Sequence, residues 1–156
     1  MTEFRYHRPS NFPPVVKNLI IINALVFVGQ VTLESSYHLT ERFMLYPLMP
    51  APLHNLLVEK GYLDSYQKFQ PYQIFTHMFS HSPTMFAHIL FNMFALWMFG
   101  RVLENVWGAK RFLLFYLASG IGAAALHLTV QYFRCEQLYQ DILAGNQVVT
   151  PERIFG

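Results

Sequence analysis

Three long apolar segments constrain the fold of this chain more than any other feature. They cover residues 18–33, 85–100 and 112–133. A helix crosses a bilayer with about 20 apolar residues, in a range of about 17–25. The third segment has that length, whereas the first two are slightly short and would also suit buried helices of a soluble protein.

Composition and charge placement decide between these two classes. Hydrophobic residues make up 53% of the chain and charged residues only 13%, whereas about a quarter of a soluble domain is charged. Basic residues precede the first segment and separate the second from the third: Arg5, Arg8, Lys17, Arg101, Lys110 and Arg111. Basic connections of this kind face the cytoplasm. We therefore predict an all-α, polytopic membrane protein with three transmembrane helices and a cytoplasmic N-terminus.

The connections complete this topology. Residues 1–17 form the cytoplasmic N-terminus, residues 34–83 a large first loop on the far side, and residues 134–156 a polar tail. Connections beyond about 12–15 residues usually contain structure of their own. We therefore expect short, membrane-associated helices in the first loop, lying in the headgroup layer. An extracytoplasmic loop without any role is the alternative.

The composition also argues against other classes. A net charge of +2, without a basic stripe that alternates with aromatic residues, excludes nucleic acid as a partner. Cys135 is the single cysteine, so no disulfide forms within the chain. The first apolar segment lacks a small-residue cleavage site, so we predict no cleavable signal peptide.

Two histidines precede the second segment. His77 and His81 have the i, i+4 spacing of metal ligands on a helix, but no carboxylate or cysteine lies nearby to complete a ligand set. We therefore predict no metal. Both histidines are expected to have a structural role, as hydrogen-bond partners of loop carbonyls.

His88 and Asn92 lie within the second segment and are also four residues apart, so their side chains share one face of the helix. Polar groups at membrane depth face the protein interior or a water-filled cavity and are candidates for function. Imidazole and amide N–H groups can stabilise an oxyanion in a water-poor site. A pair of interhelical hydrogen bonds is the alternative, and the spacing alone slightly favours it.

Four further residues suit structural roles. Glu104 can bond backbone N–H groups or Arg111, and Gly108 permits a left-handed turn between the second and third segments. Gly120 belongs to a small-residue face of the third segment, on which another helix can pack closely.

The stretch THMFSHSPTMFAHILFNMFALWMFGRVLENVWGAKRFLLFYLASG resembles the second and third transmembrane helices of rhomboid-family intramembrane serine proteases. An H-x-x-x-N pattern at His88 and Asn92 is followed by an E-x-x-x-G pattern at Glu104 and Gly108, and then by a basic residue. The resemblance extends more weakly over the first segment and the first loop. The whole chain, residues 1–156, would then be a single partial rhomboid domain.

The resemblance implies cleavage of transmembrane protein substrates within or near the bilayer, by a serine–histidine dyad in a water-filled cavity. The family needs no metal or cofactor. It also implies that His88 and Asn92 stabilise the oxyanion of the tetrahedral intermediate. The expected location is a bacterial cytoplasmic membrane, and the substrate and oligomeric state stay open.

The chain departs from the family pattern in two places. Tyr72-Gln73 stand where the first loop commonly carries Trp-Arg. The nucleophile of a G-x-S-G motif and the base histidine belong to the family's fourth and sixth helices, and Ser119 is no substitute because Leu117 occupies the first glycine position. We therefore expect an N-terminal part of a longer protease, inactive alone. The alternatives are a catalytically inactive rhomboid-like protein that binds transmembrane clients, and an unrelated three-span protein.

Overall fold

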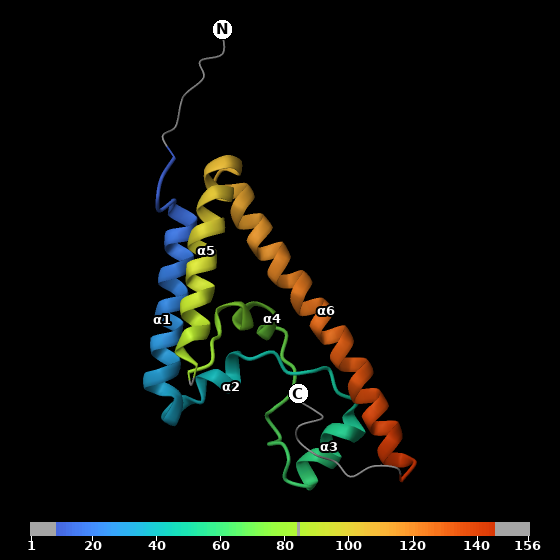
Figure 1. Ribbon diagram of the computed structural model, residues 1–156. Coiled ribbons are helices and arrows are strands. Elements are labelled where there is room, and N and C mark those ends of the chain that lie inside the picture. Colours follow the sequence, from blue (N-terminus) through green and yellow to red (C-terminus); the bar gives the residue numbers. More distant parts are fainter. Residues whose placement is uncertain (1–8, 84, 146–156) are drawn as a thin grey trace. The chain divides into compact units, whose positions relative to one another are not determined.

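The structure is a computed structural model that describes residues 9–83 and 85–145. All regular elements within these ranges are helical. Three helices have the length and apolar composition to cross a membrane: α1 (Pro14–Tyr37), α5 (Phe86–Trp107) and α6 (Ala109–Leu143). The chain is therefore a polytopic, all-α membrane protein, as the sequence predicts (Figure 1). Residues 1–8 of the expected N-terminus and 146–156 of the expected tail lie outside the described ranges.

Local chemistry sets the ends of these helices. α1 begins at Pro14, where a missing N–H costs nothing because the first helical N–H groups have no partner within the helix. α5 ends before Gly108, whose φ of 81° is accessible to glycine at no steric cost. α6 runs to Leu143, so residues 134–143, expected in the polar tail, are helical. No proline or glycine interrupts that stretch.

The first loop contains the short helices that its length predicts. They are α2 (Leu39–Phe43), α3 (Ala51–Glu59), α4 (Gln73–Thr76) and a 3₁₀ turn at His77–Phe79. The chain divides into two compact units, one formed by residues 1–40 and 79–119 and the other by residues 41–78 and 120–156. We describe each unit by itself.

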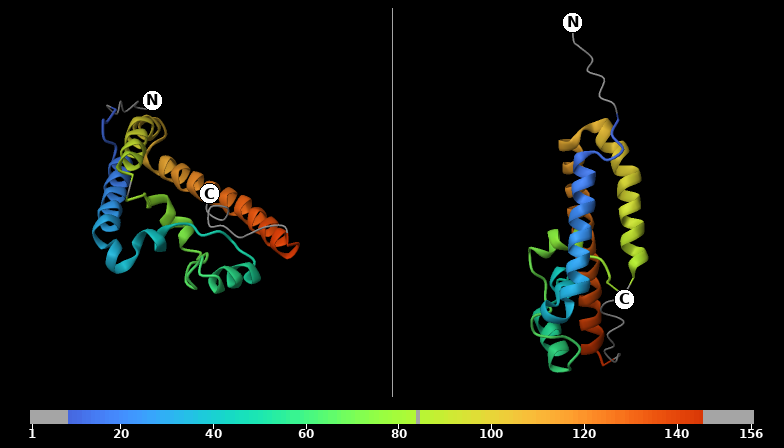
Figure 2. Two further views of the ribbon diagram at one scale, coloured as in Figure 1. Left: turned by 60° about the horizontal axis from the view of Figure 1, so that its bottom comes forward. Right: turned by 90° about the vertical axis from the view of Figure 1, so that its left-hand side faces the viewer.

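In the first unit, α1 and α5 lie side by side (Figures 1 and 2). Val16 and Leu19 of α1 form a buried cluster with Phe112 at the start of α6. Gly100 of α5 is required by this contact, because a Cβ there would lie 2.9 Å from Cγ2 of Val16. The two helices therefore approach closely where α5 has no side chain.

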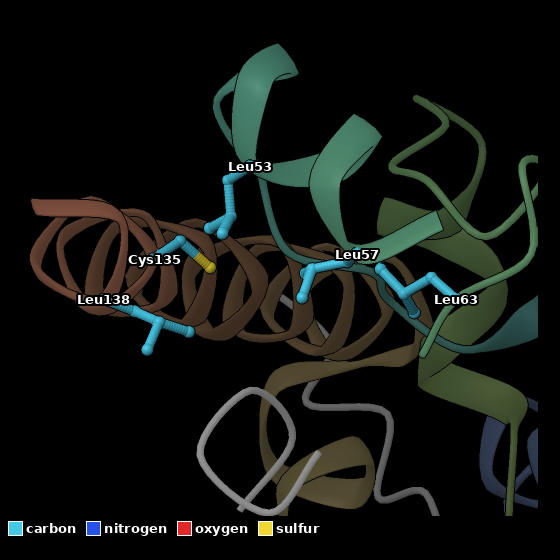
Figure 3. Close-up of a cluster of buried hydrophobic side chains, with 5 residues drawn as sticks. All are labelled: Leu53, Leu57, Leu63, Cys135 and Leu138. Carbon is cyan, nitrogen blue, oxygen red and sulfur yellow. The ribbon is translucent and has the colours of Figure 1, made fainter. Parts of the chain in front are cut away.

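In the second unit, α3 packs on the C-terminal half of α6. Leu53 and Leu57 are fully buried, and Figure 3 shows Leu53 extending from α3 toward Cys135 of α6. Nearer the start of α6, the side chain of Met78 lies against Gly120, and a Cβ at residue 120 would collide with it. The close contact at Gly120 is therefore made by a methionine of the first loop.

Candidate functional site

His88 and Asn92 lie one turn apart near the start of α5, and both are exposed. The stripe of α5 that packs toward α1 and Phe112 contains Leu96, Gly100 and Leu103. His88 and Asn92 precede Leu96 at four-residue intervals, so they continue this face toward the start of the helix. Neither side chain hydrogen-bonds a residue within the described ranges. Their N–H groups are thus available to a ligand at that face.

The ring of His88 contacts the ring of His81. Their centroids are 5.5 Å apart and the rings meet edge to face at 61°. His81 is buried, with 5% of its surface exposed, and its Nδ1–H donates to the carbonyl of Phe79 at 3.1 Å. A carbonyl only accepts, so this bond also selects the tautomer of neutral His81.

A buried glutamine of α1 holds the segment that carries His81. Oε1 of Gln30 accepts the backbone N–H of His81 at 3.0 Å. Its Nε2 donates to Oγ of Ser80 at 2.9 Å and to Oγ1 of Thr40 at 3.3 Å. Gln30 has 0% of its surface exposed. We call these four residues the Gln30 clamp, since one side chain connects α1 to α2 and to the segment before α5.

Glu34 extends the Gln30 clamp by one turn of α1. Its Oε2 accepts both the backbone N–H and the hydroxyl of Thr40, each at 2.8 Å. The hydroxyl of Thr40 therefore donates to Glu34 and accepts from Gln30. Every bond in this part of the clamp has a defined direction, which favours a single arrangement.

Burial lowers the pKa of His81, and the neighbouring His88 lowers it further, while the bond to Phe79 acts in the opposite sense. The folded chain thus holds His81 neutral more strongly than the unfolded chain does. The resulting stabilisation is complete above about pH 6.5, the ordinary pKa of histidine. It is lost as the pH falls from there toward the lowered, folded-state pKa, because the unfolded chain then binds more protons.

We accordingly expect acidification below about pH 6.5 to reduce the thermal stability of wild-type protein more than that of His81→Asn. The measurement is the unfolding temperature in detergent, followed by tryptophan fluorescence over this pH range. His127→Asn is the matched control, because His127 is exposed on α6. Identical pH dependence in wild type and His81→Asn would contradict the assignment.

Glu104 joins the other end of α5 to α1. It is buried, with 3% of its surface exposed, and its two oxygens accept the backbone N–H groups of Val15 at 2.9 Å and Val16 at 2.8 Å. The N–H groups of a first helical turn have no acceptor within their own helix, and their partial positive charge favours a carboxylate. Of the two partners that the sequence suggests for Glu104, backbone N–H groups are therefore the ones observed, while Arg111 is exposed.

The remaining candidates lie in the first loop. His77 donates from Nδ1 to the carbonyl of Gln73 at 2.9 Å. Gln73 is itself buried. Its Oε1 accepts the backbone N–H groups of Gln70 at 3.0 Å and Tyr46 at 3.4 Å. The uncharged amide of Gln73 thus anchors the loop here. Burial raises the pKa of Tyr46 to about 12, and the nearby charge of Glu41 contributes less to this shift.

Sequence reasoning missed Gln30. The position of Gln30 within an apolar segment could have indicated its role, since an amide within a membrane helix is costly unless it is hydrogen-bonded. Its partners lie 10, 50 and 51 residues away in the chain, so spacing alone does not reveal them.

Within the described ranges, no three histidine, cysteine, aspartate or glutamate side chains gather as a metal site would require.

The chain has three helices that are long and apolar enough to cross a membrane, and it buries polar side chains such as Gln30 and Glu104. These features define the chain as a polytopic integral membrane protein. Comparison with known proteins then gives two matches. The family model of the Rhomboid domain matches residues 68–135. Over 35 residues the chain is 54% identical to Rhomboid protease GluP of Bacillus subtilis (strain 168), a match that covers 22% of this chain and 7% of that protein.

These two matches support membership of the rhomboid family over residues 68–135. No solved structure matches the chain.

Proposed function

We propose that this chain forms the oxyanion-binding part of a rhomboid-type intramembrane serine endopeptidase that cleaves transmembrane protein substrates. One observation carries the proposal. The rhomboid match at residues 68–135 includes His88 and Asn92, whose side chains lie one turn apart on an exposed face of α5.

Attack on a peptide carbonyl places negative charge on its oxygen. The Nδ2–H of Asn92 and a ring N–H of His88 are donors that can meet this oxygen, and such bonds strengthen as the charge develops. Among the described residues we assign the oxyanion donors, and we assign none of them as the nucleophilic serine or the base histidine. No metal or cofactor takes part.

The Gln30 clamp supports this role by positioning His88. Gln30 holds the backbone of His81, and the His81 ring packs edge to face on His88. A donor that is held before reaction costs less to align in the transition state. We assign Gln30 and His81 as positioning residues.

We place the enzyme in a bacterial cytoplasmic membrane, with its N-terminus on the cytoplasmic side. Lys17 precedes the apolar part of α1, and Arg101, Lys110 and Arg111 surround the connection between α5 and α6. Both ends are thus basic, which favours the cytoplasmic side. The first loop then lies on the opposite side.

The test is cleavage of a reporter transmembrane substrate by the complete translation product of the gene that encodes this chain. Asn92→Ala is expected to lower kcat about 100-fold, the usual cost of removing one oxyanion donor. Tryptophan fluorescence is expected to show unchanged folding, because Asn92 is exposed. Asn18→Ala, at an exposed position of α1, is the matched control and is expected to retain full activity.

Unchanged cleavage by Asn92→Ala would exclude the oxyanion role. A wild-type protein that retains the reporter on purification without cutting it would instead support the alternative of an inactive rhomboid-like protein that binds transmembrane clients.

A further inference from the structure

A pocket of about 490 Å³ lies in the first loop, between α3, the residues that precede it and the segment that follows it. This volume is within the range of small-molecule sites, about 300–1,000 Å³. The lining is divided in character. Leu48, Met49, Val58 and Phe69 supply apolar surface. None of the residues assigned to proteolysis lines this pocket.

The polar part of the lining is rich in hydrogen-bond donors: His54, Asn55, Ser65, Gln67 and Lys68. No carboxylate belongs to the lining among the residues that the structure describes. Oε1 of Gln67 accepts the backbone N–H of Asp64 at 2.9 Å, so the rest of that amide can only donate. Nε2 of His54 is buried and has no hydrogen-bond partner within the described ranges. A buried polar atom without a partner is uncommon and calls for an explanation.

We propose that this pocket binds the phosphate head group of an anionic phospholipid. A phosphate offers acceptor oxygens and negative charge, which suit the ammonium group of Lys68 and the neighbouring amide and hydroxyl donors. The glycerol and upper acyl chain then contact the apolar lining around Leu48 and Phe69. Free phosphate would use the same donors but would leave this apolar surface exposed to water.

The membrane supplies the ligand. The chain is an integral membrane protein, so its loops meet lipid head groups at high local concentration. A lipid bound here would fasten α3 and its flanking segments to the bilayer surface. The inference is independent of proteolysis, because it concerns residues 47–69 only.

The experiment titrates the detergent-solubilised chain with dihexanoyl phosphatidylglycerol, dihexanoyl phosphatidylcholine and inorganic phosphate, while NMR follows the ring signals of His54. We expect phosphatidylglycerol alone to shift these signals at low concentration. Lys68→Gln is expected to weaken that binding about tenfold, the usual scale for loss of a charge-assisted bond. Lys60→Gln is the matched control, because Lys60 directly follows α3 and does not line the pocket.

Folding of each variant is checked at Cys135, whose buried thiol packs against Leu53 of α3 and resists labelling while α3 stays in place. If Lys68→Gln exposes this thiol, Ser65→Ala replaces it as the test variant. Equal shifts with phosphatidylcholine would overturn the proposal. So would equal shifts with inorganic phosphate, which would indicate a site for a free anion. Equal weakening in Lys60→Gln, or none in Lys68→Gln, would also overturn it.

Discussion

Glu104→Ala is expected to lower the free energy of unfolding of the α1–α5 unit by about 3–5 kcal/mol. The substitution removes the acceptor of two backbone N–H groups, those of Val15 and Val16. Each bond to a charged group contributes about 1.5–3 kcal/mol. Glu104 is buried, so solvent does not screen these bonds fully and little water can replace the carboxylate. α1 is expected to detach first at its N-terminal end.

Both tryptophans lie in this unit and report on the change. Nε1 of Trp97 donates to the carbonyl of Asn11 at 3.1 Å, just before α1, so its fluorescence follows that contact during chemical unfolding in detergent. Glu104→Gln retains one carbonyl acceptor and is expected to give an intermediate loss. Glu59→Ala, at an exposed position, is the control.

The protection of the Cys135 thiol adds an internal comparison, because Cys135 belongs to the other unit. A loss of stability no larger in Glu104→Ala than in Glu59→Ala would show that the two bonds contribute nothing.

Gln30→Leu is expected to cost about 2–4 kcal/mol, because it removes the acceptor of the His81 N–H and the donor to the hydroxyl groups of Ser80 and Thr40. Leucine has a similar size, so the loss reflects hydrogen bonding more than a cavity. Hydrogen exchange at the backbone N–H of His81 is the direct measurement, and we expect it to accelerate strongly. The ring signals of His88 are expected to shift as well, since His81 packs against that ring.

Thr32→Val is the matched control for Gln30→Leu. Thr32 lies in the same helix and is exposed, and its hydroxyl donates only to the carbonyl of Val28 in its own helix. If exchange at His81 stays slow in Gln30→Leu, the clamp does not hold this segment. If it accelerates equally in Thr32→Val, the effect belongs to α1 as a whole.

Much of the fold could be predicted because its causes are local. Apolar length identifies the three spanning helices, and the length of the first loop indicates short helices within it. The positive φ of Gly108 follows from the position of a glycine between two helical segments. Helix ends were less predictable. α6 extends past the apolar segment because its last turns are stabilised by packing of Cys135 and Leu138 on α3, which hydropathy does not register.

The candidate site divides in the same way. The H-x-x-x-N spacing places His88 and Asn92 on one helical face, and this needs only the geometry of a helix. The choice between an oxyanion role and interhelical hydrogen bonds depends on which groups of other segments lie near the two side chains. Neither side chain forms a hydrogen bond within the described ranges, which supports the proposed role.

Composition and the period of the helix are properties of the sequence, so they already show that apolar helices cross a membrane and which polar residues share a face. The groups that Gln30 and Glu104 bind become known from the packed helices. Their acceptor and donor atoms belong to backbone and hydroxyl groups as far as 51 and 89 residues away. Every residue offers such groups, so partner choice is visible only once α1 and α5 are packed together.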